Sequence, residues 1–330
     1  MVLSIIIVNY NSKPVLRRCL HSILECQLPF PYEVFIIDNA SDESISDLKD
    51  EFQAFVFVFN PANIGFAGAC NAGILQSSGT YVLLLNPDTV LNPGSLPPMI
   101  EYLEEHRDVA VSGCKIFDSL GGIEHSTHSF PTLTKEFFHA NEFLKSLVRY
   151  DSVVGGLLRR FIPAKSLNSY SDHSSIMEVD HVTGACMMVR RAAIDRVGLL
   201  DEAFFLYNEE VEWSYRMKCA GYKTVFLPGS SIIHHFGYST KQRVQKQTAN
   251  RLLVERYRGM FYFFQKHYGF AKLMLLRLIV IQGFTLRLFL AYIKRISHSG
   301  LSPFLVQEIQ CLRSIIELAF ANNFDWRKER

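Results

Sequence analysis

Short apolar runs alternate with amphipathic segments along the first part of the chain. Residues 2–8 are mostly apolar and rich in β-branched side chains, which is typical of a strand buried on both faces. The pattern continues and predicts strands at 2–8, 33–37, 55–59 and 81–85 and helices at 13–24 and 65–75. Such alternation predicts an α/β fold with a mostly parallel central sheet flanked by helices.

Polar residues follow these predicted strands. Asn9, Asp38 and Asp88 come at or just after the ends of three strands, and Asn63 lies in the loop after another. Open sheets of this class bind ligands in the crevice outside the carboxyl ends of their strands, where the strand order reverses. We therefore expect four separate segments to bring polar groups to one crevice.

The middle of the chain is less regular. Residues 118–175 mix histidine, serine, glycine and aromatic residues, which indicates a long insertion over the active face. Regular patterning returns with a strand predicted at 179–190, an acidic segment at 204–217 and a strand at 223–227. We expect one catalytic domain over residues 1–240, with the insertion inside it.

Residues 241–330 form a helical extension of different composition, in which residues 272–295 are the most apolar. At 100° per residue, the five cations of that stretch fall within an arc of roughly 140°. A basic stripe beside Leu, Phe and Ile predicts a helix lying in the membrane interface, because a spanning helix needs about 20 apolar residues and tolerates little charge. The alternatives are that these helices pack on the catalytic domain or form a dimer, or that Gly283 divides the helix in two.

Composition and charge indicate a folded protein and argue against several classes of function. Hydrophobic residues make up 48% of the 330 residues and charged residues 20%, as in a folded protein. Seven scattered cysteines without CxxC spacing predict reduced thiols and no structural zinc. No secretory leader is expected at the N-terminus. A net charge of +2, with the cations concentrated in the apolar tail, gives no support for nucleic-acid binding.

Asp88 is the candidate metal ligand. A divalent cation held by a few protein oxygens can neutralise the charge of bound phosphate groups, and a carboxylate just past a strand end is well placed to hold it. Asp88 follows an apolar strand, and Pro87 stops the strand just before it. The alternative is a turn residue that caps the next segment.

The acidic segment offers a general base. Glu209, Glu210 and Glu212 follow Asn208 and an aromatic run, and an acceptor hydroxyl must lose a proton to a positioned carboxylate. If Asn208 caps a helix, the three acids occupy its first turn, where a purely structural role is also favoured by the helix dipole. A histidine of the pair at 234–235 is a candidate to complete the metal site or to contact the diphosphate.

These residues give the chain a resemblance to a known family. The sequence resembles the family 2 glycosyltransferases with the GT-A fold, especially the bacterial rhamnosyltransferase-like branch, over roughly residues 3–240. The matching stretches are 4–11, 37–42, 63–71, 85–88, 183–185, 207–213 and 234–239.

The resemblance implies an inverting transfer and a nucleotide pocket. Asn9 and Asp38 would hold the nucleotide, with Asp38 at the base end. The same pocket would be lined by Asn63, Gly65 and Asn71.

The resemblance also implies a site for Mn²⁺ or Mg²⁺ and a catalytic base. Asp88 resembles the last acid of the family's DXD metal motif, and Asn86 occupies the position of its first acid. Glu210 matches the catalytic base, with Glu209 as the runner-up. The metal shell would be completed by His234, with His235 as the alternative, and Arg216 would face the diphosphate.

The predicted function is transfer of a sugar, rhamnose or another deoxyhexose, from a dTDP- or UDP-linked donor to a lipid-linked or surface-polysaccharide acceptor. The expected location is peripheral, on the cytoplasmic side of the inner membrane. One alternative is a membrane-attached, non-catalytic scaffold, which the intact Asp38, Asp88 and Glu210 argue against. A nucleotide-dependent oxidoreductase is the other, but residues 8–12 lack the G-x-G-x-x-G fingerprint.

Overall fold

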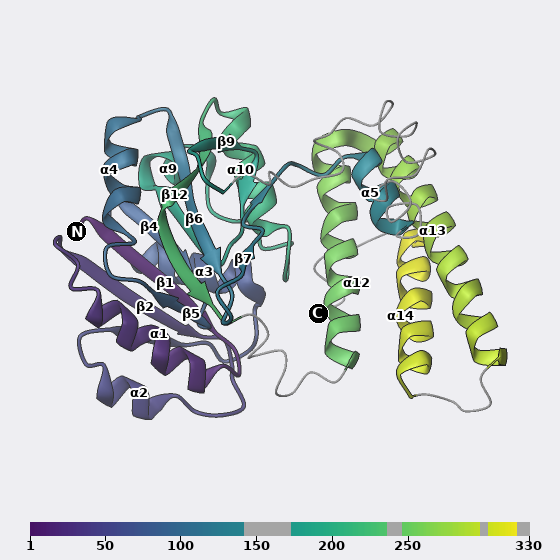
Figure 1. The fold of residues 1–330 in the computed structure, drawn as a ribbon, viewed down its shortest axis with the longest axis horizontal. Helices are drawn as coiled ribbons and strands as arrows, with labels where there is room; N and C mark the ends of the chain where they lie inside the picture. Colours follow the sequence, from purple (N-terminus) through teal and green to yellow (C-terminus); the bar gives the residue numbers. More distant parts are fainter. Residues whose placement is uncertain (142–172, 236–245, 298–302, 322–330) are drawn as a thin grey trace. The chain divides into compact units, whose positions relative to one another are not determined.

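The computed structural model describes residues 1–141, 173–235, 246–297 and 303–321 (Figure 1). These residues form two compact units. The first contains residues 1–130, 173–205 and 209–235, and the second contains 131–141, 206–208 and the helical residues from 246 onward. The boundary expected at 240 lies outside the described residues.

The first unit is built on a central sheet with strand order β3-β2-β1-β4-β11-β6-β12-β5. Its parallel half contains β1 (Leu3–Asn9), β2 (Tyr32–Asp38), β3 (Val56–Phe59) and β4 (Tyr81–Leu85). Strand order reverses at β1, because β2 pairs with one of its edges and β4 with the other. The ligand crevice of such a sheet lies at this reversal.

The other half of the sheet is mixed. Here β11 (Cys186–Arg190) runs antiparallel to both β4 and β6 (Val109–Phe117), and β12 (Lys223–His234) runs parallel to β6. The shorter strands are β5 (Thr89–Leu91), β7 (Ile123–Glu124) and β9 (Met177–Val179), and a separate pair is formed by β8 (Thr127–His128) and β10 (His181–Val182).

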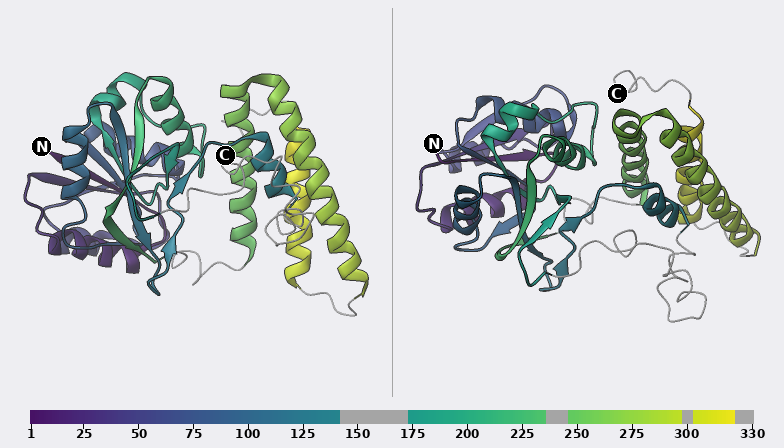
Figure 2. Two further views of the ribbon diagram at one scale, coloured as in Figure 1. Left: turned by 45° about the horizontal axis from the view of Figure 1, so that its top comes forward. Right: turned by 90° about the horizontal axis from the view of Figure 1, so that it is seen from above.

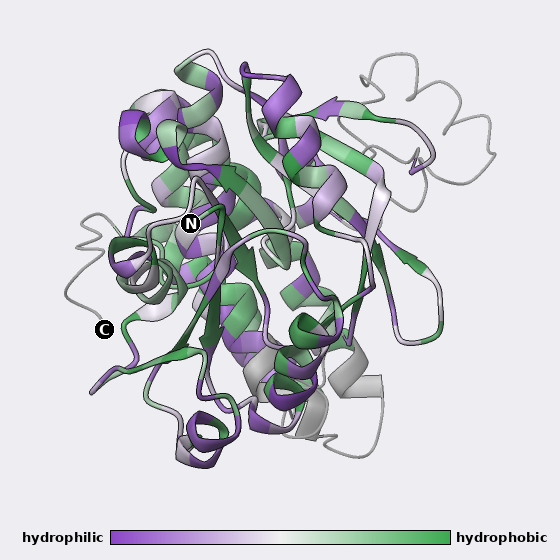
Figure 3. Ribbon diagram, turned by 90° about the vertical axis from the view of Figure 1, so that its left-hand side faces the viewer, coloured by the Kyte–Doolittle hydropathy of each residue, from purple (hydrophilic) through white to green (hydrophobic). Residues whose placement is uncertain are grey.

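Helices cover both faces of the sheet, whose strands are mostly apolar (Figures 2 and 3). Alternate residues of β1 point to opposite faces, so that Ile5 and Ile6 belong to two different cores. One core is completed by α1 (Lys13–Glu25), α2 (Ser46–Glu51) and α4 (Pro97–Glu105), and the other by α3 (Gly65–Gln76), α9 (Arg191–Val197) and α10 (Glu209–Cys219).

Two of the predicted strands differ in the structure. The single strand expected at 179–190 is wrong, because a turn at Thr183, Gly184 and Ala185 separates β10 from β11. That turn is held by long-range backbone bonds, from the Thr183 amide to the Ser126 carbonyl and from the Asn86 amide to the Ala185 carbonyl. The strand expected at 223–227 continues as β12 to His234, past a register shift after Leu227.

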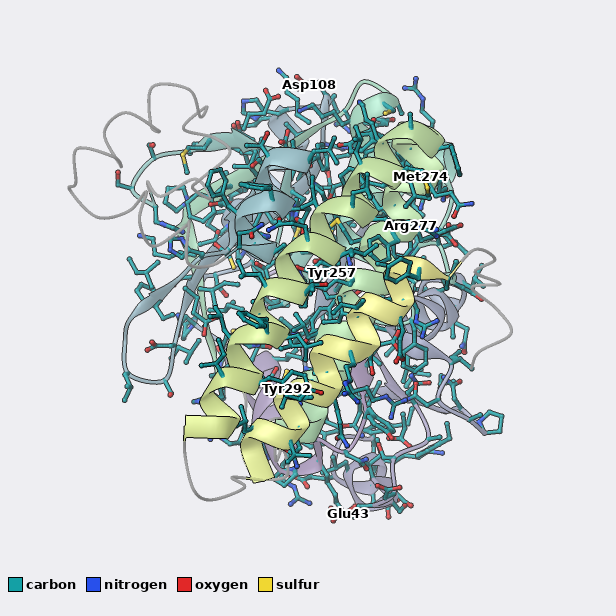
Figure 4. The ribbon with its side chains drawn as sticks, turned by 90° about the vertical axis from the view of Figure 1, so that its right-hand side faces the viewer. Glu43, Asp108, Tyr257, Met274, Arg277 and Tyr292 are labelled. Carbon is teal, nitrogen blue, oxygen red and sulfur yellow. The ribbon has the colours of Figure 1, made fainter. Side chains whose placement is uncertain are left out.

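The second unit is helical. It contains α5 (Leu133–Ala140), α12 (Lys246–Phe263), a π-helical turn at Phe264–Tyr268, α13 (Gly269–Ser297) and α14 (Pro303–Phe320). Figure 4 shows α13 and α14 side by side, and Arg313 of α14 donates to the Tyr292 hydroxyl of α13. Gly283 does not divide α13. A side chain there would lie 2.7 Å from Cβ of Ala140, so the glycine allows α5 to approach closely.

Two cations of the predicted basic stripe on α13, Arg277 and Arg287, turn toward the interior of the helical unit, whereas Lys272 is exposed. Arg277 is buried on the same side of the helix as Leu273, Val280 and Phe284. Arg287 is partly buried, with its guanidinium 5.0 Å from the centre of the Phe284 ring. The side that stays exposed is apolar, because contacts with α5 and α14 cover the cationic side. Its large exposed apolar residues include Leu275, Leu278, Leu286, Phe289 and Ile293.

Candidate active site

The ends of β1 and β2 form a buried polar cluster. Nδ2 of Asn9 donates to Oδ1 of Asp38 at 2.7 Å and to the Ser41 hydroxyl at 3.0 Å, and that hydroxyl donates to the same Asp38 oxygen at 2.6 Å. Oδ1 of Asn9 is buried without a hydrogen-bond partner among the described residues. A buried, unsatisfied acceptor of this kind is rare in native proteins, and it marks this end of the crevice as a place for a donor from a ligand.

Asn39 connects β2 to the start of α3, and sequence reasoning missed it. Its Nδ2 donates to Oδ1 of Asn63 at 2.8 Å and to the Gly65 carbonyl at 3.2 Å. Its Oδ1 accepts from the amide of Ile64 and from the side chain of Asn60, both at 3.1 Å. Asn39 directly follows Asp38 at a strand end, which is the signal that would have identified it.

Gly65 allows the start of α3 to meet the segment before α10. It adopts φ +82, and a Cβ at this position would lie 2.7 Å from the Phe205 carbonyl oxygen. The same carbonyl accepts a hydrogen bond from the Phe66 amide at 2.8 Å. The conformation and the close approach both favour glycine.

Asn71 makes its hydrogen bonds to the loop at residues 200–202. Its side chain donates to the Leu200 carbonyl at 2.9 Å and to Glu202 at 3.0 Å, and it accepts from the Leu200 amide at 3.1 Å. Three bonds to one loop give it a role in fixing residues 200–202. The structure therefore brings together Asn9, Asp38, Asn63 and Gly65 but occupies Asn71 elsewhere.

Asp88 and His234 form the candidate metal centre. The turn after β4 is fixed by the Thr89 hydroxyl, which donates to the Asn86 carbonyl at 2.7 Å. Oδ1 of Asp88 lies 3.2 Å from Nε2 of His234, and Nδ1 of His234 lies 3.0 Å from Glu124. Burial lowers the pKa of His234, but hydrogen bonds and charge from Asp88 and Glu124 outweigh it and hold the pKa above its ordinary value of 6.5.

The donor set fits a cation held by few protein ligands. Among the residues that the structure describes, no group of three or more His, Cys, Asp or Glu side chains is arranged to hold a metal ion. A carboxylate oxygen of Asp88 and Nε2 of His234 face each other. The hard oxygen suits Mn²⁺ or Mg²⁺, and the imidazole nitrogen is a common metal ligand. Phosphate oxygens and water would supply the remaining ligands, as they do for Mg²⁺ bound with nucleotides.

His235 directly follows β12, which ends at His234. Its backbone amide donates to the Asp88 carbonyl at 2.8 Å, and its Nε2 lies 3.2 Å from the Arg18 guanidinium. Burial and the neighbouring cation lower the pKa of His235. The carboxylate of Asp88 therefore meets His234 and not His235.

The two candidate bases differ in environment. Glu209 is 4% exposed, and burial together with the charge of Glu210 raises its pKa well above the ordinary value of 4.5. Glu210 is less buried, and its Cβ and Cγ lie 3.9 Å from the position of a Cβ on Gly184. Burial and the neighbouring charge therefore both favour the protonated form of Glu209. Two adjacent carboxyls in different environments are suited to different roles.

Arg216 is engaged away from the candidate metal centre. Its Nε lies 2.9 Å from Glu212, which is fully buried, and its other nitrogens donate to the carbonyls of Val197 at 2.5 Å and Leu199 at 2.6 Å. The side chain thereby closes the end of α9 onto α10. Its donors face the protein, whereas a diphosphate contact would require them to face the crevice.

A chain of contacts links Asp88 to Glu210. The Asn86 amide, two residues before Asp88, donates to Ala185 at 3.0 Å, and the preceding Gly184 faces Glu210. Cys186 pairs in register with Leu85 at the carboxyl end of β4. Asp88 and Glu210 therefore lie at the same edge of the sheet, on either side of the 183–185 turn.

The fold and this cluster of strand-end residues define the class of the protein. Residues 4–198 match the model of glycosyl transferase family 2. This match covers more than half of the chain, so the chain belongs to that family and is a glycosyltransferase.

Characterised relatives point to one branch of the family. The chain is 27% identical to the N-acetylglucosaminyl-diphospho-decaprenol L-rhamnosyltransferase of Mycobacterium tuberculosis, over 72% of this chain and 78% of the relative. It is 22% identical to the rhamnosyltransferase WbbL of Escherichia coli K12, over 73% of this chain and 86% of the relative. The sequence is rhamnosyltransferase-like.

Solved structures agree with the GT-A fold. The mannosyltransferase PcManGT from Pyrobaculum calidifontis, solved with GDP-Man and Mn²⁺, aligns with a TM-score of 0.54 and 14% identity over 96% of this chain and 85% of that one. GalNAc-T7, solved with UDP, GalNAc and Mn²⁺, aligns with a TM-score of 0.51 and 16% identity over 71% of this chain and 44% of that one. At these identities the likeness concerns the fold.

Proposed function

We propose that this glycosyltransferase is metal-dependent and inverting, and that it moves a deoxyhexose, rhamnose first among the candidates, from a dTDP- or UDP-linked donor to a lipid-linked saccharide. The observation that carries the proposal is the position of Asp88 with His234 at the same sheet edge as Glu210. In an inverting transfer the leaving diphosphate needs a metal centre, and the incoming hydroxyl needs a carboxylate base on the opposite side of the reacting carbon.

The donor would lie across the strand ends. Its base would meet the cluster of Asn9 and Asp38, where the Oδ1 of Asn9 has no hydrogen-bond partner among the described residues. A divalent cation bound by Asp88 and His234 would neutralise charge on the departing diphosphate. Asn86 has no carboxylate, so the protein supplies less negative charge here than a motif with two acids.

Glu210 is the base of this proposal. Inversion requires the acceptor hydroxyl to attack the sugar from the face opposite the diphosphate, and a carboxylate on that side accepts the proton. Burial raises the pKa of Glu209 and so disfavours its charged form, which makes Glu210 the better candidate for this role. Gly184 leaves open space in front of Glu210, because a Cβ there would meet only the Glu210 side chain, at 3.9 Å.

The relatives support the choice of donor sugar and acceptor. The mycobacterial relative is named for rhamnose transfer to a diphospho-decaprenol-linked N-acetylglucosamine, and WbbL is named as a rhamnosyltransferase. A lipid-linked acceptor is presented at a membrane surface. The proposed location is therefore peripheral, on the cytoplasmic side of the inner membrane.

The helical unit supports membrane docking through α13. The helical stretch Asn250–Ile293, which runs from α12 into α13, is long and apolar enough to cross a membrane. Of its most apolar window, 28% is buried. The exposed face carries Leu278 at 62% and Phe289 at 60% exposure. Because the cationic side of α13 is covered, we assign this apolar face to the lipid side of an interfacial helix.

Turnover of sugar nucleotides tests the enzyme proposal. The purified protein with Mn²⁺ is incubated with dTDP-rhamnose and with UDP-sugars, together with a polyprenyl-diphosphate-linked N-acetylglucosamine acceptor. We expect rhamnose transfer that is lost by at least about 100-fold in Asp88→Ala and in Glu210→Gln, because both remove groups acting on the reacting centre. Full activity in either variant would show that the roles are assigned wrongly.

Vesicle binding tests the docking proposal. Leu278→Glu combined with Phe289→Glu places two charges on the exposed face of α13 and should release the protein from vesicles. Gln265→Glu changes the charge at an exposed polar position and is the matched control. Equal sedimentation of the double variant and the control would refute docking through this face.

A further inference from the structure

The side chain of Glu124 contacts the candidate metal ligand His234 from the side opposite Asp88. Its Oε2 lies 3.0 Å from Nδ1 of the imidazole, whereas Asp88 lies 3.2 Å from Nε2. His234 is 4% exposed, and the side chain of Glu124 is 25% exposed. The ring is therefore held between two carboxylates.

Strand pairing fixes Glu124 in this place. β7 and β12 flank the end of β6, since Ile116 of β6 pairs with Glu124 on one side and with Ile232 on the other. His234 follows two residues after Ile232, where it pairs with Thr89 of β5. Glu124 thus reaches across the end of β6 to a residue 110 positions away in the chain.

The contact determines which ring nitrogen is available to a cation. A neutral imidazole carries one proton, and the nitrogen that lacks it is the metal ligand. A carboxylate that accepts from Nδ1–H keeps the proton there and leaves the lone pair of Nε2 directed toward Asp88. Histidines that bind metals commonly donate their other N–H to a carboxylate in this way.

We propose that Glu124 is a positioning residue for the metal centre: it holds His234 in the tautomer and orientation in which Nε2 faces Asp88. The inference rests on the proposed function, in which those two residues hold the divalent cation. Glu124 itself is not a ligand of the same ion, because it occupies the nitrogen that points away from Asp88.

Mn²⁺ binding measured by electron paramagnetic resonance tests the inference without recourse to activity. Mn²⁺ is titrated into the full-length protein, alone and with saturating UDP or dTDP. Removing an outer partner of this kind lowers metal affinity by about 10- to 100-fold, and we expect that loss in Glu124→Ala. Glu124→Gln keeps a neutral acceptor and should lose less. The exposed Glu105→Gln is the matched control and should bind as the wild type does.

Nitrogen-15 spectra of the histidine rings give a second readout that a general loss of stability does not move. The His234 signals are assigned by their disappearance in His234→Asn. We expect the proton on Nδ1 in the wild type at a pH where the ring is neutral, and a redistribution toward Nε2–H in Glu124→Ala.

Two results distinguish failure of the positioning role from failure of the proposed function. If the wild type binds Mn²⁺ but Glu124→Ala binds it equally tightly, or if wild-type His234 carries its proton on Nε2, the positioning role is refuted and the proposed function stands. If the wild type binds no Mn²⁺ with either nucleotide, the metal-dependent function fails and the positioning role fails with it.

Discussion

Gly65→Ala is the substitution for which the structure best defines the expected loss of folding stability. The residue adopts φ +82, where a side chain on an L-residue costs about 1–2 kcal/mol. The added Cβ would also lie 2.7 Å from the carbonyl oxygen of Phe205, a backbone atom that cannot turn aside. Overpacking of this kind costs about 1–3 kcal/mol, so we expect a total loss of about 2–5 kcal/mol.

Gly94→Ala is the matched control. Gly94 has φ +77, close to that of Gly65, but nothing lies within 4 Å of its Cβ position. Both substitutions restrict the unfolded chain by the same amount. The difference between them therefore isolates the close approach, at about 1–3 kcal/mol.

Urea unfolding followed by circular dichroism measures both free energies. A second measurement, nucleotide binding, should weaken in Gly65→Ala and stay unchanged in Gly94→Ala, because the shift of Phe205 disturbs the start of α3 beside Asn39. Equal losses of stability in the two variants would refute the argument that the close approach of Phe205 requires glycine at position 65.

Three further predictions concern the polar residues. Asn39→Ala leaves several partly buried groups without partners, at about 1–3 kcal/mol for each. It should lower the free energy of unfolding in urea by at least about 2 kcal/mol and raise the KM for the donor. A stability like that of the wild type would contradict the role of Asn39 in connecting β2 to α3. Glu209 has a raised pKa in the folded state, so its contribution to stability is fully present below its ordinary value of 4.5 and is lost as the pH rises from there toward the folded-state value. Glu209→Gln should therefore gain stability relative to the wild type at pH 8 but not at pH 4. An equal loss at both pH values would refute the argument from the raised pKa. Arg216→Ala breaks a buried pair and should cost about 3–5 kcal/mol while the KM for the donor stays nearly constant; a higher KM at unchanged stability would instead favour a diphosphate contact.

The sequence alone determined the four strands of the parallel half of the sheet and the edge at which the candidate site was expected. Strands such as β1 and β4 were predicted almost to the residue because apolar runs encode burial locally. Parallel strands deliver their carboxyl ends to one edge, so a polar residue just after a strand, such as Asp38, could be assigned to the crevice without knowledge of any contact.

Only the tertiary structure decided which of these polar groups meet. The side chain of Asn71 hydrogen-bonds to Leu200, and that of Arg216 bonds to Glu212 and to backbone carbonyls. The resemblance had assigned both residues to the donor site. Glu124 meets His234 across 110 residues, and local patterning holds no information on such a pair.

The orientation of α13 was decided in the same way. Periodicity located an apolar arc and a cationic arc on the helix, but which arc is covered depends on what packs against it. Here α5 and α14 cover the side that contains Arg277, and the apolar residues around Leu278 stay exposed. Local sequence specifies which residues share a face, whereas burial of that face is a property of contacts between segments far apart in the chain.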